Sequence, residues 1–101
     1  MIARLWHGYT KPEDAPAYHK MLLESILPGI HRIAGYNGSY VLRRDAGAEV
    51  EFVTLTFWES LDAIREFAGP DYEQCVIAPE AAHLLTRHDK RSTHYDSIRS
   101  E

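Results

Sequence analysis

The sequence predicts an α+β domain in which two main helices cover one face of a four-stranded antiparallel sheet. Strand-like and helix-like hydrophobic patterns alternate along the chain in the order βαββαβ. Only a short segment containing glycine separates the two middle strand patterns, which is typical of a hairpin. The 101 residues, 45% of them hydrophobic, are enough for one core. We therefore expect residues 1–101 to form a single domain of ferredoxin-like, or split βαβ, topology.

The first strand and the first helix have clear local signals. Residues Ile2–Tyr9 are rich in apolar and aromatic side chains and lead into a Thr-Lys-Pro turn, so they predict a strand. Asp14 is the expected cap of the helix, Pro28 is expected to kink its last turns, and Gly35 to end it. Apolar residues at three- and four-residue steps form its buried stripe: Tyr18, Met21, Leu22, Ile26, Ile30 and Ile33.

A hairpin and a second helix follow. Tyr36–Arg44 predicts the second strand, and residues 45–48 turn the chain into the third strand, Val50–Trp58. Ser60 is placed to cap the second helix, and Gly69 is placed to end it. Both helix ends can therefore be predicted from single residues.

The last third of the chain has weaker patterns. Pro79 fits the first turn of a short helix that extends to Leu85. The mixed-charge run Arg87–Arg91 is typical of a solvated connection. A last strand, more polar than the others, is expected within Arg91–Ile98.

The third strand is apolar on both of its faces. Alternation places Val50, Phe52, Thr54, Thr56 and Trp58 on one face, and Glu51, Val53, Leu55 and Phe57 on the other. A strand with this pattern is usually covered on both sides, yet the helices can cover only one side. We therefore expect a second copy of the chain to cover the other face, in a homodimer that pairs sheet to sheet.

Composition excludes several classes of partner. The formal net charge is −4, and charges of both signs are spread along the chain, so neither nucleic acid nor a membrane surface is an expected partner. The single cysteine, Cys75, cannot form an internal disulfide. No stretch approaches the roughly 20 apolar residues of a membrane helix, and the first residues lack a signal-peptide pattern. We expect a cytoplasmic protein.

Several segments together resemble a known family. They are the strand-to-helix junction Leu55–Ile64, the end of the second helix at Phe67–Gly69, the stretch Val76–Ala81, and His94-Tyr95. The sequence resembles the antibiotic biosynthesis monooxygenase family of the dimeric α/β-barrel superfamily over nearly the whole chain. The resemblance implies a dimer whose two sheets close into a barrel, with a ligand pocket in each subunit between sheet and helices.

The same resemblance implies the class of reaction. Relatives include cofactor-free oxygenases, in which the carbanion of an aromatic polyketide or quinol reacts with oxygen, and haem-degrading enzymes. Trp58 takes the place of the oxygenases' tryptophan, and Thr54 stands where they have asparagine. In the haem-degrading pattern, Ala68 replaces a histidine and Leu5 an asparagine, which disfavours haem. The implied activity is a cofactor-free monooxygenase acting on a small phenolic, quinol or polyketide-like aromatic substrate.

Two residues are the expected catalytic groups. His7 has an imidazole whose ordinary pKa suits it to accept a proton from a phenol or quinol. Trp58 can wall the pocket and donate its indole N–H. The expected substrate-binding residues are Leu5, Thr54, Thr56, Tyr36 and Tyr72. A hydrogen-bonded structural histidine, a core tryptophan and threonines chosen for strand propensity are the alternatives.

Metal and cofactor are not expected. His83, His88 and His94 are separated by five and six residues, which does not match ligand spacing on a helix. The expected partners are a second copy of the chain, a small aromatic molecule and molecular oxygen. Two other functions stay open: a non-catalytic dimeric domain that binds a small ligand, and an isomerase or cyclase that uses the same pocket.

Overall fold

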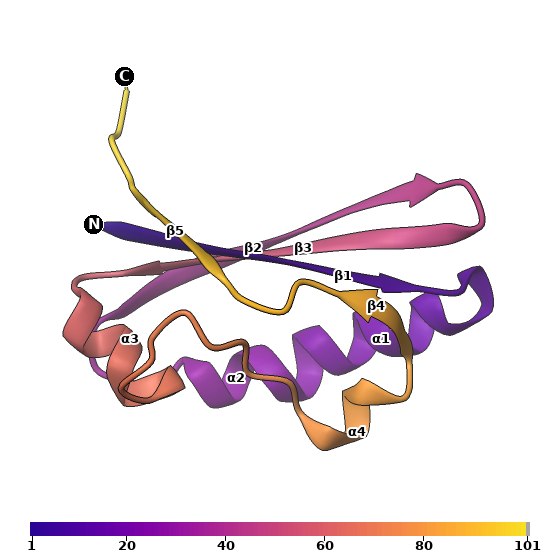
Figure 1. Cartoon of the computed structure of the whole chain (residues 1–101), viewed down its shortest axis with the longest axis horizontal. Coiled ribbons are helices and arrows are strands. Elements are labelled where there is room, and N and C mark those ends of the chain that lie inside the picture. The colour runs from indigo at the N-terminus through magenta and orange to yellow at the C-terminus, as the bar shows by residue number, and fades with distance from the viewer. Residues whose placement is uncertain (101) are drawn as a thin grey trace.

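The computed structural model describes residues 1–100 and has one antiparallel sheet with all its helices on one side (Figure 1). The strands are β1 (Ile2–Thr10), β2 (Tyr36–Ala46), β3 (Glu49–Trp58), β4 (Leu85–His88) and β5 (Thr93–Asp96). The helices are α1 (Ala15–Met21), α2 (Leu27–Ile30), α3 (Leu61–Ala68) and α4 (Pro79–Ala82). The predicted α+β class and the predicted hairpin of the second and third strands are confirmed.

The sheet has the ferredoxin-like order β2-β3-β1-β4, with β5 also paired to β1. The sheet thus has five strands, not the predicted four, because two short strands share the free edge of β1. Strand β4 pairs with residues 8–10 and β5 with residues 2–5 of β1. The predicted last strand contains β5, whereas β4 overlaps the charged stretch predicted as a connection. The short helix predicted to extend to Leu85 ends at Ala82, because Leu85 belongs to β4. Pairing with β1 stabilises β4, whose own four residues carry no strand pattern.

The first helix is continuous but changes its winding. A 3-10 turn at Pro12–Asp14 leads into α1, and a π-helical turn at Leu22–Ile26 joins α1 to α2. Pro28 has no N–H to donate to the preceding turn, and Leu27 donates to the carbonyl of Leu22 in the wider π geometry. The π turn precedes Pro28 and α2 continues through it, so the kink at Pro28 stays a prediction. Asp14 makes no capping hydrogen bond with its side chain. The helix ends at Ile30, so the predicted end at Gly35 is wrong and Ile33 lies outside the helix.

Helix α3 begins and ends where the sequence predicts. The Ser60 hydroxyl accepts a hydrogen bond from the N–H of Ala63 at 3.1 Å. At the other end Gly69 has φ +95° and donates its N–H to the carbonyl of Arg65 at 2.8 Å. Ser60 and Gly69, which are residue types strongly preferred at helix ends, therefore determine where this helix begins and ends.

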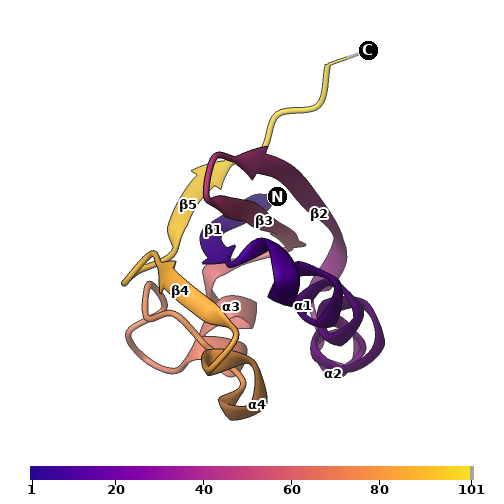
Figure 2. The same ribbon diagram turned by 90° about the vertical axis from the view of Figure 1, so that its right-hand side faces the viewer.

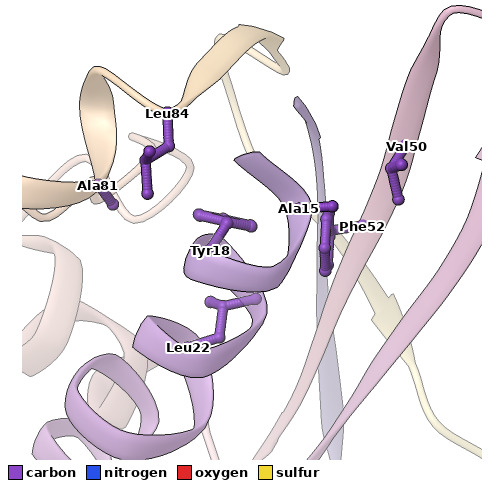
Figure 3. Close-up of a cluster of buried hydrophobic side chains, with 7 residues drawn as sticks. All are labelled: Ala15, Tyr18, Leu22, Val50, Phe52, Ala81 and Leu84. Atoms are coloured by element: carbon purple, nitrogen blue, oxygen red, sulfur yellow. The ribbon is translucent and has the colours of Figure 1, made fainter. Parts of the chain in front are cut away.

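The hydrophobic core consists of two clusters between the sheet and the helices. Figure 3 shows the first, formed by Ala15, Tyr18, Leu22, Val50, Phe52, Ala81 and Leu84. Within it the Tyr18 and Phe52 rings meet edge to face with centroids 4.9 Å apart. The second cluster surrounds Trp58 and contains Leu27, Ile30, Ala63 and Ile64. These clusters fix the helices on the sheet and leave a space between them.

The other face of the sheet has no helix on it, as Figures 1 and 2 show. By strand alternation and register this outer face carries Leu5, His7, Tyr40, Leu42, Val53, Leu55, Phe57 and Tyr95. Tyr40 is 65% exposed and Leu42 is 50% exposed. The predicted two-sided apolar character of β3 is therefore present, and the sheet-to-sheet homodimer stays a prediction. None of the helices within residues 1–100 is long and apolar enough to span a membrane.

Candidate functional site

A cavity of about 430 Å³ lies between the helix-facing side of the sheet and the helices. Its floor is formed by Arg4 and Trp6 of β1 and by Thr54 and Thr56 of β3, which are paired in register. Apolar side chains form most of its walls: Tyr18, Leu22, Ile26, Ile30, Phe67 and Ile77.

Small side chains create this space. Between the bulky Phe52 and Trp58, the cavity side of β3 has only the two threonines. Opposite them, Ser25 and Gly29 of the irregular first helix also line the cavity. The π turn thus lies at the cavity wall, a frequent position for such turns in functional sites.

Arg4 is a buried cation on the cavity floor. It is 5% exposed, and burial lowers the pKa of its guanidinium to about 10. Its Nη2 donates to the carbonyl of Gln74 at 2.7 Å and its Nη1 to the carbonyl of Tyr72. Among residues 1–100 no carboxylate lies within ion-pair distance of it. Arg4 remains protonated at neutral pH and therefore places an unpaired positive charge beside an apolar space.

Trp6 is a cavity residue that is not among the predicted site residues. Its indole N–H donates to the carbonyl of Asp89 at 2.9 Å, which fixes the ring at the edge of β1. A Cβ at Gly8 would lie 3.0 Å from this ring, so glycine leaves room for it. The alternation of β1 puts Trp6 beside Arg4 and away from His7, and that pattern is the signal that identifies it.

The structure places Thr54 and Thr56 on the cavity floor and Trp58 next to them on the same face of β3. Trp58 is fully buried, and its indole N–H donates to the Thr56 hydroxyl at 2.8 Å. Its ring stacks on Phe67 and meets Tyr36 edge to face, each with centroids 5.5 Å apart. Trp58 is not among the lining residues. It contacts two residues that do line the cavity, Thr56 and Phe67.

His7 and Leu5 lie on the outer face of the sheet, opposite the cavity. They pair with Val53 and Leu55, which point away from the helices. His7 Nδ1 is 2.7 Å from Oδ2 of Asp89. The expectation that these two residues share one pocket with Thr54 and Trp58 is corrected, because odd and even positions of β1 point to opposite faces.

Tyr36 and Tyr72 lie near the cavity without lining it. The Tyr36 hydroxyl donates to Ser39 Oγ at 2.8 Å, while its ring covers Trp58. Tyr72 contributes its backbone carbonyl to Arg4, and its ring packs edge-on against His94 with centroids 5.1 Å apart. Both tyrosines support residues of the site.

Like Trp6, His94 belongs to the site but is not among the predicted site residues. Its Nε2 is 3.0 Å from Arg4 Nη1, so Nε2 accepts from the guanidinium. Its Nδ1 is buried without a hydrogen-bond partner in the described part of the chain. Burial first, and then the positive charge of Arg4, lower the pKa of His94. The ring is therefore neutral at pH 7.

The lowered pKa of His94 predicts a pH-dependent stability. Its folded-state pKa lies below the ordinary 6.5, so the unfolded chain binds more protons as the pH falls. We expect the free energy of unfolding to fall more between about pH 7.5 and about pH 5.5 in the wild type than in His94→Gln. Urea denaturation at both pH values measures this difference. Equal pH dependence in the two proteins would contradict it.

The lining does not fit a haem iron. Among the described residues that line the cavity there is no histidine, cysteine or methionine. Tyr18 also lines it, but burial raises the pKa of its hydroxyl to about 12, so it keeps its proton. Within residues 1–100, no group of three or more His, Cys, Asp or Glu side chains is placed to share a metal ion.

The chain has the α+β fold found in structures of antibiotic biosynthesis monooxygenases. A protein from Deinococcus radiodurans described as a candidate member of that class matches with a TM-score of 0.71 and 16% identity, over 100% of this chain and 96% of its own. The similarity to this class of structures therefore extends over the full length of the chain.

Two further solved structures have named activities. SnoaB from Streptomyces nogalater, a cofactor-independent oxygenase, matches with a TM-score of 0.63 and 19% identity, over 98% of this chain and 95% of its own. The haem degrader MhuD from Mycobacterium tuberculosis, with two haems bound, matches with a TM-score of 0.62 and 16% identity, over 100% and 99%. The sequence matches no protein-family model and no curated protein. At these identities the matches establish the shared fold.

Proposed function

We propose that the chain is a cofactor-free monooxygenase acting on a small phenolic, quinol or polyketide-like aromatic substrate. The observation that carries this proposal is the apolar cavity whose floor combines Arg4, Trp6 and the hydroxyls of Thr54 and Thr56. An apolar space with a few convergent polar groups suits a flat aromatic molecule with one or two oxygens. The fold shared with a cofactor-independent oxygenase supports the oxygenase class.

The site's own charge supports the first chemical step. A substrate O–H or acidic C–H near Arg4 loses its proton more readily, because the buried cation stabilises the resulting anion. Among the described lining residues Glu80 alone carries a carboxylate, and it lies on α4, where its side chain is exposed. In this proposal Glu80 or water takes the proton, and the Thr54 hydroxyl orients the substrate oxygen.

Oxygen then reacts with the substrate anion itself. The anion transfers one electron to dioxygen, and the two radicals combine into a carbon-bound peroxide anion. The peroxide takes back the proton removed in the first step, and loss of water from the resulting hydroperoxide leaves a ketone. In balance, one substrate methylene group and one dioxygen give one carbonyl group and one water, so the substrate supplies all the electrons. Arg4 stabilises negative charge in the substrate anion and in the hydroperoxide as it forms.

Oxygen uptake with an anthrone tests this reaction. We expect one dioxygen consumed per anthraquinone formed, at a rate above the spontaneous oxidation, in buffer containing a metal chelator. Thr54→Val, which keeps the shape and removes the hydroxyl, should lower the rate by about fivefold to thirtyfold, since a lost substrate hydrogen bond costs about 1–2 kcal/mol. His7→Ala, on the opposite face, is the matched control and should keep it. No uptake above background with a panel of anthrones and quinols contradicts the oxygenase proposal.

A non-catalytic ligand-binding domain is the second candidate. It is favoured by Trp58, whose indole N–H is used within the core and is not directed at a ligand. Binding of an aromatic molecule without oxygen uptake would select it. Conversion of the same molecule under anaerobic conditions would instead select an isomerase or cyclase.

The outer face of the sheet is proposed to bind a second copy of the chain. Leu42 on this face and Leu23 on the first helix are 50% and 51% exposed, so they form a matched pair. We expect Leu42→Asp to weaken self-association at least tenfold, because it places a charge in an apolar interface. Leu23→Asp should leave it unchanged. Sedimentation equilibrium measures both, and a wild type that stays monomeric at high concentration contradicts the proposal.

A further inference from the structure

The charge of Arg4 is not balanced within the described part of the chain. Its hydrogen-bond partners are the carbonyls of Tyr72 and Gln74 and the imidazole of His94, all neutral groups. Burial lowers the pKa of Arg4, and a negative charge on Cys75 would raise it. By contrast, each of four arginines with more exposed side chains pairs with a carboxylate: Arg44, Arg65, Arg87 and Arg91.

An unpaired buried cation is costly unless something compensates it. Desolvation of a charged side chain costs several kcal/mol, and a paired partner or strong hydrogen bonds usually offset it. Three hydrogen bonds leave the Nε–H and one Nη2–H of Arg4 without a partner among residues 1–100. Since Arg4 lines the cavity, a molecule bound there lies beside this side chain.

Neighbouring residues hold the guanidinium in one position. The ring of Phe67 lies 5.5 Å from the Arg4 guanidinium carbon. The carbonyls of Tyr72 and Gln74 hold its outer nitrogens, and these residues belong to the segment that runs from α3 to α4. A cation fixed in this way does not need to be ordered when a ligand binds, which favours affinity for an anion.

We propose that the cavity binds its aromatic ligand as an anion, with an ionised oxygen (phenolate, enolate or carboxylate) placed at Arg4. This inference rests on the proposed function only in taking the cavity as the substrate site. It adds that Arg4 determines specificity: the protein selects among flat aromatic molecules by charge. A neutral molecule of the same shape leaves the cation uncompensated and binds more weakly.

Calorimetric titration with 1-naphthoate and 1-naphthamide tests this selectivity. The two probes have the same ring system and nearly the same shape, but only the first is charged at neutral pH. We expect the wild type to bind 1-naphthoate at least tenfold more tightly, since a hydrogen bond to a charged group contributes about 1.5–3 kcal/mol. Equal affinities, or binding of neither probe, overturns the proposal.

Substitutions locate the selectivity at Arg4. Arg4→Met should bring the affinity ratio of the two probes close to one, while Arg4→Lys should keep part of it. Arg32→Met removes an exposed arginine and should leave the ratio unchanged. Arg4→Met is tested only if it folds, as judged by circular dichroism. If it does not fold, the affinity ratios of the wild type and of Arg4→Lys still test the proposal. An Arg4→Met protein that folds and keeps the full ratio overturns the assignment.

The two proposals can fail separately. Charge selectivity without oxygen uptake on any anthrone rejects the monooxygenase and keeps the anion site. Oxygen uptake with equal binding of the two naphthalene probes rejects the anion site and keeps the monooxygenase.

Discussion

Trp58→Ala is expected to lower the free energy of unfolding by about 3–5 kcal/mol, the usual cost of removing a fully buried tryptophan. Trp58 lies between the ring of Phe67 and that of Tyr36, so its loss leaves a cavity lined on two sides by aromatic rings. It also leaves Thr56 without the indole N–H that it accepts. Urea denaturation followed by circular dichroism measures the change.

Trp58→Phe separates packing from hydrogen bonding at the same position. Phenylalanine keeps an aromatic ring between Tyr36 and Phe67 but removes the donor to Thr56, so we expect a loss of about 1–2 kcal/mol. If Trp58 acts through Thr56, the oxygenase rate of Trp58→Phe should resemble that of Thr56→Val. A rate unchanged in both variants would contradict a role for this hydrogen bond in catalysis.

Gly35→Ala is expected to lower the free energy of unfolding by about 2–4 kcal/mol. Gly35 has φ +90°, and a Cβ there would lie 2.5 Å from the Cβ of Ala63 on α3. Its carbonyl also accepts the N–H of Glu59 at 2.8 Å. Alanine would therefore push the segment between the first helix and β2 away from the start of α3.

Gly38→Ala provides the matched control. Gly38 has φ +106°, but nothing lies within 4 Å of the added Cβ. We expect it to cost about 1 kcal/mol, from the backbone conformation alone. Equal losses at the two positions would mean that the close approach of Gly35 to Ala63 contributes nothing.

Local signals in the sequence predict the parts of the fold that depend on single residues. Ser60 and Gly69 fix α3 because a hydroxyl cap and a left-handed glycine act within one turn. The hairpin between β2 and β3 is predictable for the same reason, since it turns at Gly47 with φ +73°. Local signals do not predict the π turn or strand β4. The π turn depends on the missing N–H of Pro28, and β4 depends on pairing with β1, which is distant in sequence.

The candidate site is predictable only in part. Alternation puts Thr54 and Thr56 on one face of β3, and the cavity lies on that face. For β1 the sequence separates Arg4 and Trp6 from Leu5 and His7, but both faces contain apolar residues. Which face meets the helices depends on the register with β3, where Arg4 lies opposite Thr56. Without that register, the proton chemistry of imidazole at neutral pH favours His7 over Arg4.

The two short strands that share the free edge of β1, β4 and β5, also affect how this sheet can meet another sheet. An open strand edge offers unpaired N–H and C=O groups that can add strands from another molecule. Here β4 and β5 have four residues each, and residues 89–92 interrupt the edge between them. The opposite edge, β2, carries Arg43, Arg44 and Asp45 near its end. Both edges thus resist fibre-like growth, and the proposed pairing through the outer face would add no strand to either edge.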